Sequence, residues 1–116
     1  MKKRILTLAL LALVLANCRH DAEIPATPIL TFENDIKPII LNGCARSGCH
    51  NGSGESPTLT NYEQVMGIVK SGEPHKSKLY KVITKLWSGN MPPEGPLADE
   101  QIKNIYIWIS QGAKEK

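Results

Sequence analysis

The sequence predicts an all-α domain of about four short helices joined by long loops. Apolar residues recur at three- and four-residue spacing in several segments, which is the pattern of a helix with one buried face. No segment shows the alternation of apolar and polar residues that is typical of a half-buried strand. The length of 116 residues allows one small domain.

The first predicted helix covers residues 35–41. Pro38 is tolerated in its first turn, where the backbone N–H has no helical partner. Gly43 follows as a stop signal. Residues 44–58 contain three glycines and a proline, and they are predicted to form a loop.

Three more helices are predicted further along the chain. Thr60 and Glu63 match a capping box, which opens a second helix that continues to about residue 70. Ser77 is the candidate N-cap of a third helix, whose apolar residues have helical spacing: Leu79, Val82, Ile83 and Leu86. Residues 87–97 hold three prolines and two glycines, which favours a loop. The strongest helical pattern is in residues 99–111, with a buried stripe of four residues: Ile102, Ile105, Tyr106 and Ile109.

Residues 1–17 are predicted to be a signal peptide. Three basic residues precede a run of about a dozen largely apolar residues. This run is shorter than the roughly 20 residues of a membrane-spanning helix and has the length of a signal-peptide core. The same three residues account for the net charge of +3, since the remaining 11 Lys and Arg balance 11 Asp and Glu. The balance gives no indication of nucleic-acid binding.

Cys18 ends the segment Leu15-Ala16-Asn17-Cys18, which resembles a bacterial lipobox. Cleavage there would leave Cys18 as a lipid-bearing N-terminus, and ordinary signal cleavage nearby is the alternative. Residues 18–31 are polar, carry two prolines and are predicted to be a flexible tether from the lipid to a domain at residues 32–116. The expected location is a periplasm-facing membrane surface, with the inner or outer membrane left open.

The motif that most clearly indicates a function is formed by Cys44, Cys49 and His50. A histidine directly after a cysteine, with a second cysteine shortly before, is the arrangement for covalent c-type haem. Two thiols reach the vinyl groups on one porphyrin edge, and the adjacent imidazole reaches the iron. The usual motif has two residues between the cysteines and this one has four, a bulge that Gly48 would help to form.

The same residues leave two alternatives open. A disulfide between Cys44 and Cys49 is plausible in an exported protein. A zinc site would need His75 as a fourth ligand, and this residue lies far along the chain from the others.

Met91 is the candidate for a second axial ligand. Methionine is a common choice in electron-transfer haems, where its thioether raises the reduction potential. Met91 stands before two prolines in the loop ahead of the last helix, whereas Met66 lies inside a predicted helix, where core packing is the plainer role. His75 is the competing sixth ligand, in a polar stretch.

In this order, the motifs resemble the monohaem c-type cytochromes of the planctomycete-type cytochrome c family. The resemblance covers most of residues 32–113 and rests on these segments: Phe32 with Asp35-Ile36-Lys37-Pro38-Ile39, Cys49-His50-Asn51-Gly52, Gly72-Glu73-Pro74, Ser77-Lys78-Leu79-Tyr80, Met91-Pro92-Pro93, Ile102 to Trp108-Ile109, and Gln111-Gly112-Ala113. It departs from the family in the cysteine spacing and at Ala98, where Ser or Thr would cap the last helix.

The resemblance implies a small cytochrome c-like fold around one covalent haem c. Cys44 and Cys49 would be the thioether attachments, His50 the proximal ligand and Met91 the distal ligand. The expected function is single-electron transfer between periplasmic or membrane redox proteins, without enzymatic activity or a small-molecule substrate. Two rivals remain: a gas-binding or catalytic haem protein in which Met91 leaves the iron, and a haem-free, disulfide-stapled lipoprotein that acts as an interaction module.

Overall fold

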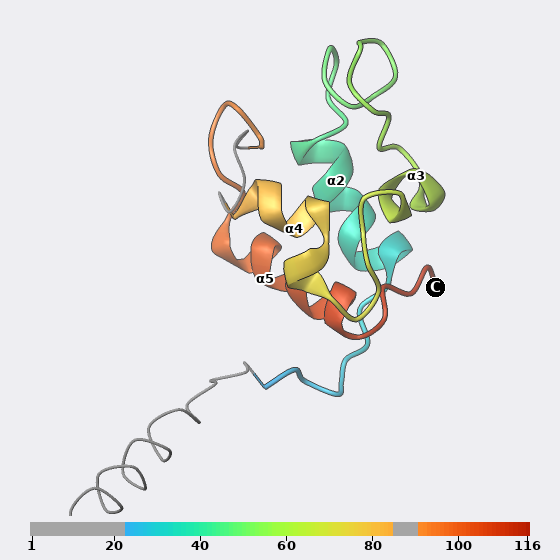
Figure 1. Ribbon diagram of the computed structural model, residues 1–116, viewed down its shortest axis with the longest axis vertical. Helices are drawn as coiled ribbons and strands as arrows, with labels where there is room; N and C mark the ends of the chain where they lie inside the picture. The colour runs from blue at the N-terminus through green and yellow to red at the C-terminus, as the bar shows by residue number, and fades with distance from the viewer. Residues whose placement is uncertain (1–22, 85–90) are drawn as a thin grey trace, which may run out of the picture.

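Helices form every regular element in the part of the chain that the computed structural model describes, residues 23–84 and 91–116. In chain order they are η2 (Phe32–Ile36), α2 (Lys37–Gly43), α3 (Tyr62–Met66), η3 (Pro74–Lys76), α4 (Lys78–Ile83) and α5 (Asp99–Ser110) (Figure 1). The predicted all-α class is therefore confirmed. The signal peptide, Cys18 and Leu86 lie outside the described residues, and the predictions for them stay predictions.

The first helical segment begins earlier than the sequence predicts. A π-helical turn, η2, precedes α2 and starts after Thr31, whose hydroxyl accepts a hydrogen bond from the N–H of Asn34. The carboxylate of Asp35 in turn accepts from the N–H of Thr31 at 2.7 Å. This reciprocal pair satisfies donors that a helix start leaves open. The segment ends at Gly43, so Cys44 follows the last turn of α2 directly.

For the second helix, the sequence predicts the wrong cap residues and too great a length. The capping box is formed by Asn61 and Gln64, one residue later than the predicted pair of Thr60 and Glu63. The helix, α3, ends at Met66 rather than near residue 70. The following residues instead bond to a distant part of the chain, for example through the Ile68 carbonyl, which accepts from the N–H of Leu79. Local turn bonds from the N–H groups of Ile68 and Val69, together with these bonds to the α4 region, replace the last predicted turn.

Ser77 holds the loop before α4 in place. It stands at the N-cap position, as predicted, but its side chain does not cap the helix. The hydroxyl, only 1% exposed, accepts from the N–H of Lys70 at 2.8 Å and donates to the Glu73 carbonyl at 3.0 Å. These bonds satisfy a polar group that would be costly to bury alone. They also seat the start of α4 beside the turn that follows α3.

Trp108 on α5 is the centre of the core. The indole is fully buried, packs against Phe32 with ring centroids 6.1 Å apart, and donates from Nε1 to the Lys114 carbonyl at 2.9 Å. The predicted stripe of α5 is correct for Ile105 and Ile109, which are 0% exposed. Its other two members, Ile102 and Tyr106, are only half-buried. The helix is therefore turned so that Trp108 faces inward.

The segments that flank the helical body lie together at one end of it (Figure 1). The Gln111 side chain accepts from the N–H of Leu30 and donates to the carbonyls of Pro25 and Pro28. The N–H of Phe32 donates to the Lys114 carbonyl. The latter part of the predicted tether is thus hydrogen-bonded to the end of α5.

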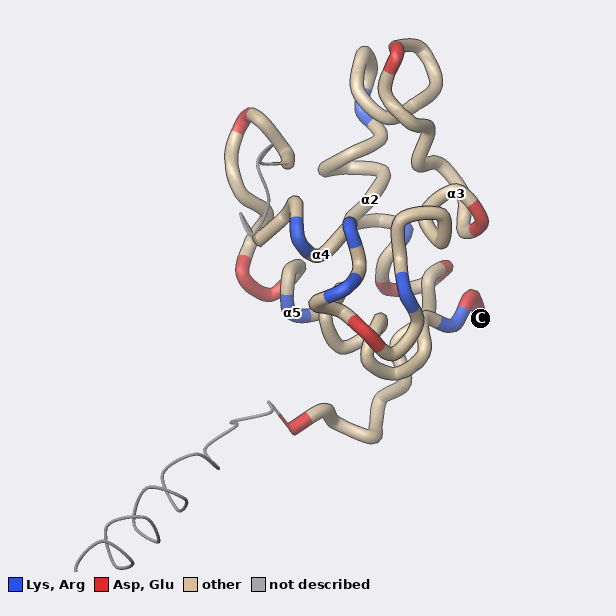
Figure 2. The backbone as a smooth tube through the Cα atoms, in the orientation of Figure 1, with Lys and Arg blue, Asp and Glu red and all other residues tan. Residues whose placement is uncertain are grey.

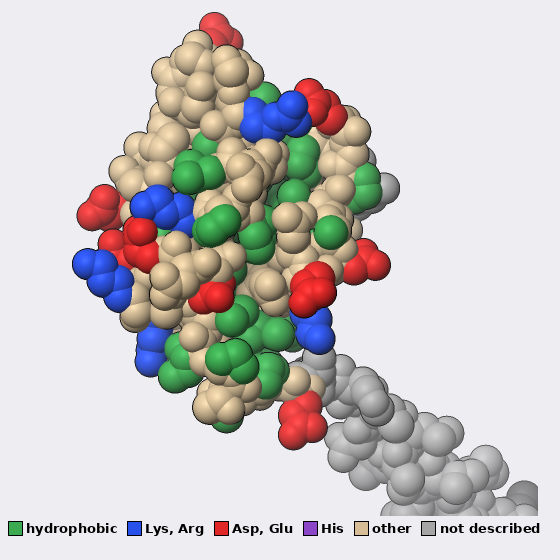
Figure 3. All heavy atoms as spheres, turned by 180° about the vertical axis from the view of Figure 1, so that it is seen from behind, with side chains coloured by type: hydrophobic (Ala, Val, Ile, Leu, Met, Phe, Trp, Pro, Cys, Tyr) green, Lys and Arg blue, Asp and Glu red, His purple; other side chains and the backbone are tan. Residues whose placement is uncertain are grey.

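Charged residues are distributed unevenly along the backbone. Lysines follow one another on α4 and the chain before it, whereas two acidic residues open α5 (Figure 2). On the face seen from behind, apolar side chains reach the surface in patches between charged ones (Figure 3). Within the described residues, no helix combines the length and the apolar character needed to cross a bilayer.

Candidate functional site

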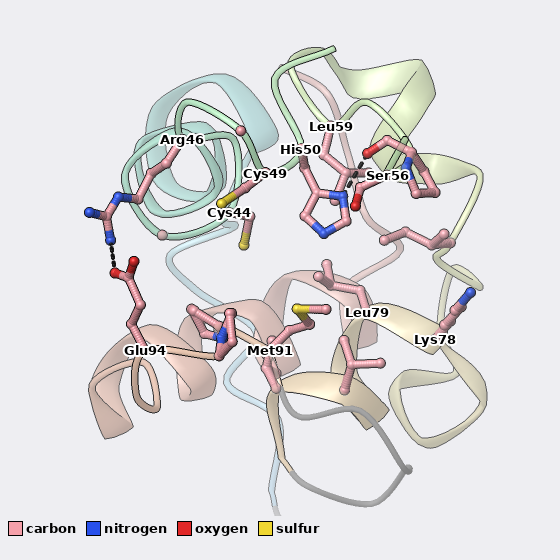
Figure 4. A pocket seen from close by; sticks show the side chains of 18 residues that line it. Cys44, Arg46, Cys49, His50, Ser56, Leu59, Lys78, Leu79, Met91 and Glu94 are labelled. Atoms are coloured by element: carbon pink, nitrogen blue, oxygen red, sulfur yellow. Dashed lines mark hydrogen bonds and ion pairs between the residues drawn. The ribbon is translucent and has the colours of Figure 1, made fainter. Parts of the chain in front are cut away.

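All four residues predicted to hold a haem line one cavity. The cavity has a volume of about 510 Å³, in the range of ligand pockets, and lies between the end of α2, the loop after it, α4 and residues 91–94 (Figure 4). Its polar and sulfur-bearing members include Cys44, Cys49, His50 and Met91. Much of the remaining wall is aliphatic and comes from Leu59, Ile68, Leu79, Val82 and Ile83. The structure thus gathers the candidates from two distant parts of the sequence.

The loop after α2 brings both thiols and the imidazole to the same wall. Cys44 is anchored to the helix end because its N–H donates to the Ile40 carbonyl at 2.8 Å. The loop closes where the N–H of His50 donates to the Cys44 carbonyl at 3.2 Å. Gly48 has a φ of 78°, a left-handed conformation that glycine adopts without steric cost. The four residues between the cysteines form a loop, and Gly48 is the residue in it with this conformation.

The ring of His50 is oriented by a hydrogen bond to a backbone carbonyl in the same loop. Nδ1 lies 2.6 Å from the Pro57 carbonyl oxygen, which can only accept a hydrogen bond, so Nδ1 carries the proton and donates. Nε2 of the neutral ring is then unprotonated, and it points into the cavity (Figure 4). Metal-binding histidines commonly have this second hydrogen bond, which fixes the tautomer and the ring plane. The neutral form of His50 therefore presents a nitrogen lone pair to the cavity.

Met91 lies across the cavity from His50 (Figure 4). Its N–H donates to the Val82 carbonyl at 3.1 Å, which ties the start of this segment to the end of α4. The next two residues, Pro92 and Pro93, also line the cavity and have no N–H to offer. The side chain is 37% exposed, so its thioether is held at the cavity wall rather than in the core.

Burial makes the Cys44 thiol a weaker acid than an ordinary cysteine. Loss of hydration around the sulfur, followed by the nearby Cys49, raises the pKa of the Cys44 thiol to about 11. Cys49 is half-buried, and both residues are free cysteines in the structure. Because the thiolate is the reactive form, the two cysteines of this loop are chemically unequal.

We expect this inequality in an alkylation experiment on the folded chain without haem. At pH 8 a pKa of about 11 leaves roughly one thiolate in a thousand at Cys44, so iodoacetamide should modify Cys49 first. The rate at Cys44 should rise about tenfold per pH unit up to that pKa. Peptide mapping measures both sites, and urea is the control, because unfolding should equalise them. Equal rates in the folded chain would contradict the burial of Cys44.

His75 stands apart from the cavity. Its ring contacts those of Tyr80 and Tyr106, with centroids 5.5 and 5.7 Å away, and it does not line the wall that carries His50. The structure therefore does not bring this competing ligand to the site. Across residues 23–84 and 91–116, no three His, Cys, Asp or Glu side chains are grouped as metal ligands.

The rim of the cavity carries an ion pair that the sequence does not reveal. Arg46, in the loop between the cysteines, bonds to the carboxylate of Glu94, three residues after Met91. Both side chains line the cavity mouth (Figure 4). They are 48 residues apart in the chain, so no local pattern connects them.

Comparisons with known proteins give no relative for this chain: no protein-family model, no curated protein and no solved structure matches it.

Proposed function

We propose that this chain is an exported monohaem c-type cytochrome that transfers single electrons between protein partners. The observation that carries the proposal is the shared cavity of Cys44, Cys49, His50 and Met91. These are the residue types that covalent attachment and two-sided axial ligation of one haem require. The resemblance to the planctomycete-type cytochromes c supports the same function.

The donor set fits a haem in three respects. The two cysteines lie on one wall, on the same loop as the histidine that follows them, as attachment along one porphyrin edge requires (Figure 4). In its neutral form His50 would offer an unprotonated Nε2, because its Nδ1 donates to the Pro57 carbonyl. Met91 offers a thioether from the opposite wall. In this assignment Cys44 and Cys49 would hold the haem through thioether bonds, and His50 and Met91 would be the ligands of its iron.

Each residue would have a defined task in electron transfer. When bound, a haem would supply one-electron chemistry between protein partners. Met91 and the aliphatic walls would favour its reduced state, since both raise the reduction potential. With His50 and Met91 both serving as ligands, no position would be left for a substrate. The lysines of α4 and its preceding chain, of which Lys76 pairs with Glu73, would be the side that attracts an acidic redox partner (Figure 2).

Export and anchoring belong to the same proposal. Residues 1–17 would direct the chain out of the cytoplasm, and a lipid on Cys18 would hold it at a periplasm-facing membrane. The thioether chemistry is consistent with this location, because it takes place outside the cytoplasm. The anchor would keep the domain close to redox proteins of the membrane.

The mass of the exported protein tests this function. The chain is produced in a host with haem-attachment machinery and weighed under denaturing conditions, next to the double variant Cys44→Ser/Cys49→Ser. We expect the wild type to carry the mass of one haem and the double variant to carry none. A wild-type mass lower by two hydrogens, without haem, would overturn the proposal. It would favour the disulfide-stapled interaction module.

A further inference from the structure

Two contacts join the loop of the cysteines to the segment of Met91. One is the ion pair between Arg46 and Glu94. The other is the approach of Leu97 to Gly43, at the end of α2. We call the Arg46–Glu94 pair the clasp, since it links the two walls at the mouth of the cavity (Figure 4).

The contact at Gly43 brings the two segments within reach of each other. Leu97 is only 8% exposed, and a methyl group added at Gly43 would lie 2.8 Å from its Cδ2 atom. A larger residue at Gly43 would force the Leu97 side chain to shift. Leu97, at the end of the Met91 segment, is thereby packed against the last residue of α2, the helix that ends immediately before Cys44.

Few other bonds hold the Met91 segment. Its backbone makes one hydrogen bond to the rest of the described chain, from the N–H of Met91 to the Val82 carbonyl. A second bond, from Gly95 to Pro92, lies within the segment. In the middle of the segment, the Glu94 side chain provides a polar link to the opposite wall through its bond to Arg46. Loss of that link leaves the middle of the segment without a cross-cavity contact.

We propose that the clasp positions Met91 over the cavity, opposite His50. Arg46 and Glu94 act here as positioning residues, and the inference rests on the proposed function, in which Met91 is the distal ligand. The geometry also gives a role to the long spacing between the cysteines. Arg46 belongs to the four residues between them, and this loop carries its guanidinium to the segment of the facing ligand.

The expected effect is small, since the two side chains are 54% and 69% exposed to solvent. Exposed ion pairs shift an equilibrium by roughly a factor of two to five. The clasp therefore biases Met91 towards the cavity without locking it there. High salt should weaken this bias, because the screening length falls to about 3 Å at 1 M ionic strength.

Imidazole binding to the ferric protein tests the clasp, because imidazole has to displace the distal ligand. Arg46→Gln and Glu94→Gln should each bind imidazole about twofold to fivefold more tightly than the wild type. The variant with both changes should bind no more tightly than either single variant, and the charge swap Arg46→Glu/Glu94→Arg should restore the wild-type affinity. Glu33→Gln, which removes the matched ion pair to Lys37, is the control and should have no effect.

Hydrogen exchange of residues 91–97 provides a second readout that does not depend on a bound group. Whether or not the isolated protein carries haem, the backbone amides of this segment should exchange about twofold to fivefold faster in both single variants than in the wild type. A wild type without haem overturns the proposed function, and exchange then still tests the clasp. Unchanged imidazole affinity in haem-bearing variants, or unchanged exchange, overturns the clasp alone.

Discussion

Alanine at Trp108 is expected to lower the free energy of unfolding by about 3–5 kcal/mol. The indole is fully buried on α5 and packs against Phe32, so its removal leaves a cavity that rigid neighbouring helices cannot fill. The hydrogen bond from Nε1 to the Lys114 carbonyl is lost as well. The free energy of unfolding of a small domain is about 5–15 kcal/mol in total, so this change removes much of its stability.

Urea unfolding, followed by far-ultraviolet circular dichroism, measures the free energy of unfolding that Trp108→Ala loses. Trp108→Phe serves as the graded control, since it keeps an aromatic ring in the core and should cost less than alanine. Tyr106→Ala is the matched control on the same helix, because Tyr106 is only half-buried. If Trp108→Ala and Tyr106→Ala shift the midpoint equally, the packing of α5 described above is incorrect.

Leucine at Met91 should remove the distal ligand and preserve the volume of the side chain. The haem-bearing variant should keep its covalent mass, because Cys44 and Cys49 are unchanged. It should lose the near-infrared charge-transfer band of methionine-bound ferric haem and bind external ligands readily. The reduction potential should fall by on the order of tenths of a volt, within the roughly 0.8 V range that axial ligands cover.

Met66→Leu is the matched control for this experiment. Met66 ends α3 and packs partly buried against the core, so the same substitution should leave the spectrum and the potential unchanged. Retention of the methionine band in Met91→Leu together with its loss in Met66→Leu would reverse the assignment. Retention in both variants would exclude methionine ligation by either residue.

The helices of this protein were predictable to different degrees. The α5 helix is long enough for its apolar periodicity to identify it within a residue of either end. In α3, by contrast, the sequence contains two overlapping capping patterns, and the one at Asn61 and Gln64 forms. Local preference does not separate such neighbours, because the bonds of the following residues to the α4 region decide where the helix ends.

The site was partly predictable. The adjacency of Cys49 and His50 and the spacing to Cys44 are visible in the sequence, and a loop methionine before two prolines is a distinctive signal. The exclusion of His75 was not visible, since its separation from the cavity depends on how α4 and α5 bring Tyr80 and Tyr106 around it. The partners Pro57 and Glu94 were not visible either, because their roles arise from contacts across folded loops.

The sequence by itself determined the all-α class, the position of α5 and a short set of candidate ligands. These features depend on periodicity, turn chemistry and residue type within a few neighbouring positions. Only the tertiary structure decided that Cys44, Cys49, His50 and Met91 line one cavity, and that Arg46 meets Glu94 at its mouth. The physical reason is that such contacts depend on the packing of distant segments around Trp108 and Leu97, which no local pattern encodes.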